Sequence, residues 1–394
     1  MQRRSFLKGA GVVTVVVVGG GVWRAYDEGV FSVGEGPAYE PWKDWRKDSN
    51  DGSPLALVRA AILAASPHNT QPWLFKVTNS SIELYLDTQR NVGALDLYLR
   101  EEHIGMGCSL ENLMLAAAAN GYNATVTLRP GKLEPIPANP KPQLVARVDL
   151  VSGKREDSEL YNAIPHRHTN RGTYLPQKPL PAEFLDALSG LASDDPEVKI
   201  FLFTADAGRK KIAEISSAAN SEIYSDPEVV RGSDRWIRIN WSEVQHYRDG
   251  LSIDAFGLPP IATGIAKMMP LWMLKWAGSR TAKDGYAELM LSAPLIGIVG
   301  VHDRYDRANC LRAGRTWQRA HLLATARGVA GRPCNEAVEM IDYERVLGKP
   351  ARRADLLGEV MGDTAWQPTF VFYMGYPTLT ARASPRRSVE NVLL

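Results

Sequence analysis

Hydrophobic and polar positions follow two periods along this chain, one helical and one extended. Apolar residues recur at helical spacing from Leu55 to Ala65, and two short extended runs follow at Trp73–Val77 and Ile82–Leu86. The same periods predict further helices over 100–121, 181–191, 206–222 and 312–328, and strands over 143–150, 198–203, 295–301 and 369–374. Helices and strands mixed in this way indicate an α+β fold.

Two of the predicted helices share a pattern of small and apolar residues. The sequence from Gly107 to Gly121 aligns with the sequence from Gly314 to Gly328 without a gap, at a constant offset of 207 residues. Both stretches carry leucine and alternating alanines before the final glycine. Two interpretations are open, an internal duplication or two ordinary core helices that end in glycine caps.

The N-terminus has a basic head and an uncharged run. Arg3, Arg4 and Lys8 precede 15 uncharged residues from Gly9 to Trp23, which is typical of a twin-arginine export signal over 1–26, although a buried N-terminal strand is the alternative. We therefore expect recognition by the twin-arginine export machinery and an exported protein, either periplasmic or tethered to the outer side of a membrane. Processing after Gly21 and an uncleaved tether are both open. Residues 27–50 are predicted to be a linker, with the mature fold starting near Leu55.

Composition narrows the class of protein. Among 394 residues, 46 Lys and Arg oppose 44 Asp and Glu, so the net charge of +2 gives no basic surface of the kind that nucleic acids require. No stretch of about 20 apolar residues offers a membrane-spanning helix, which excludes a polytopic membrane protein. Three cysteines allow at most one disulfide, and the close pair His166 and His168 would need distant ligands to hold zinc, so we expect no metal.

A polar loop follows the first predicted helix. It reads Ser66-Pro67-His68-Asn69-Thr70-Gln71-Pro72-Trp73, and its two prolines prevent regular structure. The amides of Asn69 and Gln71 can present paired donors and acceptors to a planar heterocycle. Each residue alone is equally explained by a polar turn.

Two basic segments accompany this loop. In Arg167-His168-Thr169-Asn170-Arg171, alternate residues of an extended segment face one side, so Arg167, Thr169 and Arg171 are expected to converge, unless the segment is a solvated basic turn. Near the C-terminus, Gly375-Tyr376-Pro377 is followed nine residues later by Arg386-Arg387. Arginine forks suit a dianionic phosphate.

Together these motifs resemble the FMN-dependent nitroreductases over residues 55–394. That family carries the signature Pro-Ser-x-x-Asn-x-Gln-Pro-Trp, an Arg-x-Ser-x-Arg/Lys motif and a Gly-Tyr-Pro turn before phosphate-binding cations. The chain looks most like the Acg-type branch, in which Thr-Asn-Arg replaces the serine-based motif. The resemblance implies a nitroreductase-like α/β/α sandwich, an FMN cofactor, and an oxidoreductase that reduces small nitroaromatic or quinone-type acceptors.

The resemblance also implies roles for particular residues. Arg171 is expected at flavin N1/O2, Asn69 and Gln71 at the pyrimidine edge, and the backbone amides of Asn335 and Glu336 beside N5. His68 borders the site and either caps the loop or donates a proton. The phosphate is assigned to Arg167, Thr169, Arg386 and Arg387.

The motifs are divided between the two copies. The first copy, 51–157, has the Asn69 loop without an arginine motif, and the second, 158–394, has the arginine motif without the loop. One complete set predicts a fused pseudo-dimer with a single FMN, acting as a monomer. The rival function is an exported flavin-binding or storage protein with an occluded site and little catalysis. A hydrolase is disfavoured because no Gly-x-Ser-x-Gly elbow occurs.

A Met- and Trp-rich run over 259–276 remains. It is interpreted as a lid over the flavin, as plain core, or as a surface that touches a membrane. A lid would make NAD(P)H a poor reductant.

Overall fold

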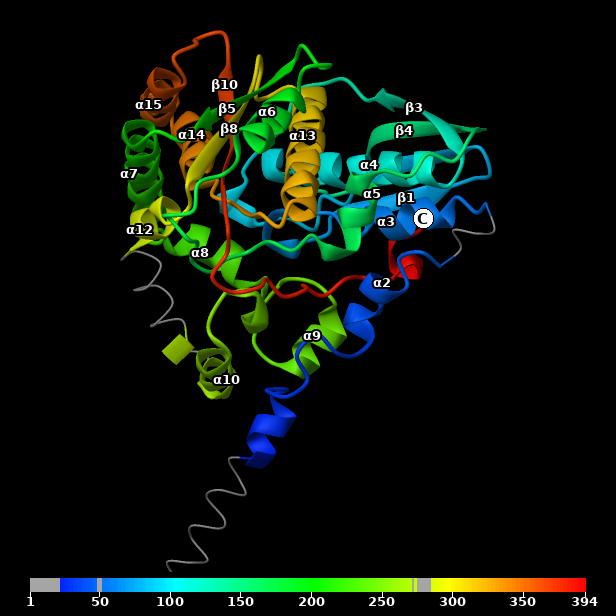
Figure 1. Ribbon diagram of the computed structural model, residues 1–394, viewed down its shortest axis with the longest axis horizontal. Helices are drawn as coiled ribbons and strands as arrows, with labels where there is room; N and C mark the ends of the chain where they lie inside the picture. The colour runs from blue at the N-terminus through cyan, green and yellow to red at the C-terminus, as the bar shows by residue number, and fades with distance from the viewer. Residues whose placement is uncertain (1–21, 48–51, 271–272, 275–284) are drawn as a thin grey trace, which may run out of the picture.

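The computed structural model describes residues 22–47, 52–270, 273–274 and 285–394. Two four-stranded antiparallel sheets lie on either side of helix α13 in the view of Figure 1, the first to the right and the second to the left. The α+β class predicted from the sequence is confirmed.

The first sheet is built from the first half of the chain. Its strands are β1 (Trp73–Val77), β2 (Ser81–Leu86), β3 (Tyr122–Leu128) and β4 (Gln143–Ser152). The spatial order is β1-β2-β4-β3, and every pairing is antiparallel. The two predicted extended runs pair with each other, with Trp73 opposite Leu86 and Val77 opposite Ile82.

The second sheet repeats this arrangement. Its strands are β5 (Val198–Phe203), β8 (Leu295–Val301), β9 (Ala330–Pro333) and β10 (Gln367–Gly375), in the order β5-β8-β10-β9, again antiparallel. In both sheets the first two strands in sequence pair, and the fourth lies between the second and the third. A helix of 20 residues joins the second strand to the third in each, α4 (Arg100–Ala119) and α13 (Arg307–Ala326).

The helices α4 and α13 cross at two glycines. A Cβ on Gly107 would lie 2.1 Å from the Leu311 carbonyl oxygen, and one on Gly314 would lie 2.0 Å from the Ile104 carbonyl oxygen. Only hydrogen fits at either position. Gly121 and Gly328 follow the two helices with φ of 82° and 67°, the left-handed conformation that ends a helix and that glycine adopts without strain.

The central strands of the second sheet are buried on both faces. In β10, Phe370 and Phe372 pack toward the core that contains α4, α13 and the first sheet, whereas Val371 and Tyr373 pack toward α7 (Asp206–Ile223), α14 (Glu336–Val346) and α15 (Arg352–Met361). This alternation follows from the two-residue period of a strand.

The described residues include seven further helices. They are α3 (Leu55–Ala61), α5 (Glu159–Ala163), α6 (Ala182–Gly190), α8 (Pro227–Asp234), α9 (Trp241–Tyr247), α10 (Pro260–Met268) and α12 (Tyr286–Leu291).

Part of the predicted linker 27–50 belongs to the core. Tyr39, Trp42 and Trp45 are buried against it, and α2 (Glu40–Lys43) forms there, so the packed fold begins well before Leu55. Three large aromatic side chains within seven residues bury too much apolar surface for a solvated tether. The prediction of a linker over this segment was wrong.

The C-terminal tail returns from the second sheet to the first. The backbone NH of Arg386 donates to the Ala38 carbonyl at 2.8 Å, and Leu393 forms a parallel bridge with Phe75 of β1. The tail therefore crosses the loop that precedes β1. Among the described residues, no helix is long and apolar enough to cross a membrane.

Candidate functional site

The polar loop between α3 and β1 has an unusual backbone. His68, Asn69 and Gln71 have φ of 45°, 56° and 51°, in the left-handed region that costs a non-glycine residue about 1–2 kcal/mol. Such conformations persist only where surrounding contacts fix them, and they cluster at functional sites. In this loop, the hydrogen bonds of the Asn69 and Gln71 side chains fix the backbone conformation.

Asn69 links the loop to two distant segments. Its Nδ2 donates to the carbonyl oxygens of Gly250 and Pro385, each at 3.0 Å, and its Oδ1 accepts from Nη1 of Arg386 at 2.6 Å. Every hydrogen-bonding atom of the amide is used. The side chain thereby sets the position of the Arg386 guanidinium.

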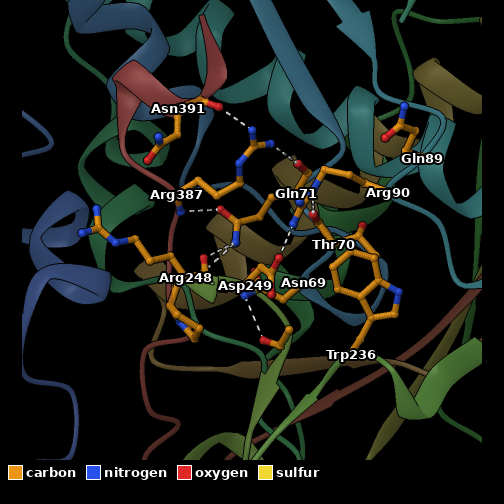
Figure 2. Close-up of polar contacts among 12 residues, drawn as sticks. Asn69, Thr70, Gln71, Gln89, Arg90, Trp236, Arg248, Asp249, Arg387 and Asn391 are labelled. Atoms are coloured by element: carbon orange, nitrogen blue, oxygen red, sulfur yellow. Dashed lines mark hydrogen bonds and ion pairs between the residues drawn. The ribbon is translucent and has the colours of Figure 1, made fainter. Parts of the chain in front are cut away.

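Gln71 holds the same tail one residue further on (Figure 2). Its Oε1 accepts from the backbone NH of Arg387 at 2.8 Å, and its Nε2 donates to the Arg248 carbonyl at 2.8 Å. The Gln71 carbonyl accepts from Nη1 of Arg387 at 3.2 Å. A polar cavity of about 680 Å³ opens beside these groups and is lined by Gln245, His246, Tyr247, Arg248, Arg387 and Asn391.

Arg90 contacts the residue before Gln71. Its Nε donates to the Thr70 carbonyl at 2.6 Å, and its guanidinium forms an ion pair with Asp249.

Arg167 and Arg386 bring two buried cations together. Each side chain is only 2% exposed, and both donate to the Leu63 carbonyl, at 3.0 Å from Arg167 and 3.5 Å from Arg386. In the described part of the chain neither guanidinium forms an ion pair with a carboxylate, and the Nε atom of each has no hydrogen-bond partner. Burial lowers the pKa of Arg167 to about 10, and burial together with the Arg167 charge lowers the pKa of Arg386 well below its usual value.

Two neutral imidazoles border this cation pair. Nδ1 of His321 lies 3.4 Å from Nη1 of Arg167, and the His168 ring packs edge-on against Trp42. Burial, reinforced by the neighbouring arginines, lowers the pKa of His168 to about 3 and that of His321 well below 6.5. Nδ1 of His168 and Nε2 of His321 are buried without partners. The cluster thus holds unused polar atoms and two positive charges.

Arg171 lies close to His68, and its own guanidinium is near enough to Arg332 and Arg167 to interact with both charges. Its Nη1 donates to the Ala255 carbonyl at 3.3 Å, and Nε2 of His68 lies 2.7 Å from Oγ of Ser233. Burial and the charge of Arg171 lower the pKa of His68 to about 4, so this imidazole is neutral at pH 7. Thr169, which lies between Arg167 and Arg171 in the sequence, is half-buried.

Asn335 and Glu336 stand at the start of α14. The Asn335 side chain donates to Oε2 of Glu101 at 2.6 Å and accepts from the Val371 backbone NH at 2.9 Å, while Glu336 accepts from the Tyr286 hydroxyl. First-turn NH groups of a helix have no acceptor within the helix. Asn335 and Glu336 thus lie at a helix N-terminus, and the use of their backbone amides beside flavin N5 stays a prediction.

Two buried carboxyl groups, which were not identified from the sequence, join α4 to the start of α14 and to the polar loop. Glu101 and Glu102 open α4; Glu101 contacts Asn335, and Oε2 of Glu102 accepts from the Thr70 hydroxyl at 2.9 Å. Burial raises the pKa of Glu101 to about 7 and that of Glu102 well above its usual value. In the sequence these two residues belong to a run of charged residues, Arg100-Glu101-Glu102, which looks the same as the solvated first turn of a surface helix. No described cluster of three or more histidine, cysteine, aspartate and glutamate side chains can hold a metal ion.

No family model matches this chain. The "Putative NAD(P)H nitroreductase Rv3131" of Mycobacterium tuberculosis is 25% identical over 353 residues, which cover 86% of this chain and 90% of that protein. The "Putative NAD(P)H nitroreductase acg" of the same organism is 35% identical over 81 residues, 21% of this chain and 24% of that protein. The chain is thus a distant relative of proteins named as NAD(P)H nitroreductases.

Solved structures were also compared. The FMN-dependent nitroreductase NfnB from Mycobacterium smegmatis, in complex with NADPH, aligns at 17% identity with a TM-score of 0.35, covering 59% of this chain and 96% of that one. A nitroreductase with bound FMN from Desulfitobacterium hafniense aligns at 12% identity with a TM-score of 0.34, covering 60% and 97%.

Proposed function

We propose that this chain is an FMN-dependent oxidoreductase of the nitroreductase type, with one flavin per chain. The observation that carries the proposal is the pair of buried guanidinium groups of Arg167 and Arg386, which have no carboxylate partner in the described part of the chain. Carbonyl and amide oxygens accept from both guanidinium groups, and Arg386 lies over the Trp42 ring, but two buried like charges without an anion remain costly. A phosphate group supplies that anion, and its oxygens accept from the Nε atoms that are otherwise unpaired.

The surrounding residues fit the rest of an FMN molecule. FMN, when bound, supplies the redox chemistry, and the protein supplies binding, orientation and electrostatics. Arg171 provides a cation on the side of His68, suited to negative charge at the pyrimidine edge. The first-turn amides of α14, at Asn335 and Glu336, provide donors at a helix N-terminus.

Asn69 and Gln71 take a role that differs from direct contact with the pyrimidine edge. Both amides are committed to the tail and to residues 248–250, with Asn69 orienting Arg386 and Gln71 holding Arg387. We therefore assign them as positioning residues for the phosphate cations. His68 is neutral at pH 7 and bonded to Ser233, so it acts as a hydrogen-bonding group and is not an imidazolium acid.

The repeated topology supports a fused pseudo-dimer. Both sheets have the same strand order, and Gly107 and Gly314 make reciprocal contacts at the crossing of α4 and α13. Only one set of the motifs exists in the sequence, since Arg167 and Arg386 come from the second copy and Asn69 from the first. We infer one flavin site per chain, built from both copies.

We also infer that the protein is exported in folded form. Arg3 and Arg4 before the uncharged run support this proposal. Residues 1–21 lie outside the described residues, as do Trp272 and Trp276 of the predicted lid.

The test begins with the purified full chain. We expect a visible flavin spectrum and a flavin-to-chain ratio near one, and a ratio near two or zero would overturn the single-site proposal. Arg167→Gln is expected to weaken FMN binding by about ten- to a hundredfold, equivalent to about 1.5–3 kcal/mol. The exposed Arg129→Gln is the matched control and should leave the affinity unchanged. Equal affinity of both variants would place the phosphate elsewhere.

A second measurement separates an oxidoreductase from a flavin store. The protein is reduced with dithionite and mixed with a small nitroarene or quinone. Reoxidation within seconds supports the enzyme, whereas reoxidation no faster than in buffer alone supports the storage protein.

A further inference from the structure

An apolar surface lies at the end of the molecule where the N-terminal segment and α10 meet. We name it the apolar tip and define it by Trp23, Tyr26, Phe31, Ile261 and Ile265. All five side chains are exposed, from 58% for Ile265 to 80% for Ile261. In Figure 1 the N-terminal helix over 22–27 and α10 both project below the body of the protein.

The spacing places these residues on outward faces. Ile261 and Ile265 are four apart on α10, and Trp23 and Tyr26 are three apart on the helix over 22–27, so each pair shares one face of its helix. The opposite face of α10 is buried and includes Thr263. A surface helix of a globular protein normally turns its apolar side inward, and α10 exposes two isoleucines.

Contacts between the two segments fix them relative to each other. Nζ of Lys267 donates to the Gly29 carbonyl at 2.9 Å and pairs with Asp254 at 2.7 Å, and the lysine side chain is only 3% exposed. A Cβ on Gly264 would lie 3.1 Å from Cγ1 of Val30. The buried ion pair and this close packing hold residues 29–30 against α10, next to the exposed side chains of the tip.

We propose that the apolar tip docks on a lipid bilayer, at the boundary between headgroups and acyl chains. Tryptophan and tyrosine favour this boundary because their rings combine an apolar body with a polar group. The uncharged run from Gly9 leads directly into Trp23, and Arg3, Arg4 and Lys8 precede it, so the chain that enters the tip has the composition of a membrane-associated segment with cations for anionic headgroups.

An environment-sensitive label on the full chain tests the proposal. Cys108, Cys310 and Cys334 are all buried, so a thiol-reactive NBD dye labels an introduced surface cysteine selectively. Ile265→Cys is compared with Val151→Cys on β4, where the valine is 66% exposed against 58% for Ile265. With vesicles of phosphatidylcholine and phosphatidylglycerol, we expect a blue shift of the emission at 265 and none at 151. No shift at 265, or equal shifts at both positions, would overturn the proposal.

Vesicle flotation separates the tip from the N-terminal run. The triple variant Trp23→Ser, Ile261→Ser, Ile265→Ser keeps residues 1–21 intact, and we expect its vesicle affinity to fall at least about tenfold, because each buried side chain contributes about 1.5–3 kcal/mol. Val151→Ser with Leu175→Ser is the matched control and should float as the unmodified chain does. Unchanged flotation of the triple variant would show that the run binds alone and the tip does not dock. A concentration-dependent blue shift at 265 without vesicles would instead assign the surface to a second copy of the chain.

Discussion

Gly107 and Gly314 meet where α4 and α13 cross, and each packs against the carbonyl of the residue three positions before the other. Gly107 faces Leu311, and Gly314 faces Ile104. The offset of 207 residues that relates the two helices in sequence also relates both partners of this contact. The crossing therefore has the reciprocity of a twofold interface within one chain.

Substitution of either glycine is expected to destabilise the fold. In Gly314→Ala the added methyl would lie 2.0 Å from the Ile104 carbonyl oxygen, which forces the helices apart. We expect a loss of about 1–3 kcal/mol or more in the free energy of unfolding, measured by urea denaturation. Gly358→Ala in α15 is the control, because nothing lies within 4 Å of its Cβ, and it should be neutral or slightly stabilising. Equal stability of the two variants would contradict the tight crossing.

The sequence predicted most of the regular structure because its periodic segments are strongly apolar. Strand 295–301 is buried throughout, and the strand 198–203 was predicted with its observed ends. Two strands of the four-stranded sheets, β3 and β9, were missed for physical reasons, as was the pair of two-residue strands β6 (Ile237–Arg238) and β7 (Leu251–Ser252). β3 is half-exposed and threonine-rich, and β9 has only four residues, including glycine and proline. Such segments become strands through pairing with β4 and β10.

For the candidate site, residue types were predictable and partners were not. The structure brings Asn69 and Gln71 beside Arg386 and Arg387, whereas the motifs assigned the two pairs to opposite ends of the flavin. That both amides are saturated by backbone groups and the tail depends on contacts between residues more than 300 positions apart. Arg100, the first residue of α4, is a further example, because neither its burial nor its ion pair with Asp342 gives a local signal in the sequence. Sequence spacing reports neighbours on one element and says nothing of contacts between distant segments.

A carboxylate introduced beside Arg167 should lower the affinity for FMN and raise the stability of the FMN-free protein. In His321→Glu, the carboxylate replaces an imidazole whose Nδ1 lies 3.4 Å from Nη1 of Arg167. It would neutralise the buried cation and repel a phosphate. We expect FMN affinity to fall at least about tenfold, while the FMN-free protein gains about 1–3 kcal/mol over the neutral variant His321→Gln. Affinity is measured by fluorescence titration and stability by urea denaturation. If the Glu and Gln variants bind FMN equally well, the phosphate does not lie at this cluster.

Export can be tested without altering the fold. Changing Arg3→Lys together with Arg4→Lys keeps the charge and removes the paired guanidinium groups that define the signal. We expect the double variant to stay in the cytoplasm, still loaded with flavin, as judged by cell fractionation and the visible spectrum. Substitution of Lys8→Arg, which leaves the pair intact, is the control. Normal export of the double variant would show that the N-terminus is not a twin-arginine signal.

The buried carboxyl group of Asp96 should make stability depend on pH. Burial raises its pKa from 3.8 to about 6, against the opposing effects of Arg100 and of the backbone NH groups of Glu101 and Glu102. Because the folded state binds this proton more tightly than the unfolded state, the contribution of Asp96 to stability is complete below pH 3.8 and is lost as pH rises to about 6.

Asp96→Asn removes this titration while keeping the size of the side chain. Relative to the unmodified protein, the variant should therefore gain about 2–3 kcal/mol in the free energy of unfolding between pH 4 and pH 8, measured by urea denaturation at both pH values. The lowered pKa values of His68 and His103, both about 4, produce the opposite trend, a loss of stability as pH falls from 6.5 to 4. Both histidines are present in the two proteins, so their contribution cancels in the difference. Asp194→Asn, at an exposed carboxylate, should show no such gain. A pH-independent difference for Asp96→Asn would mean that this carboxyl group titrates alike in the folded and unfolded states.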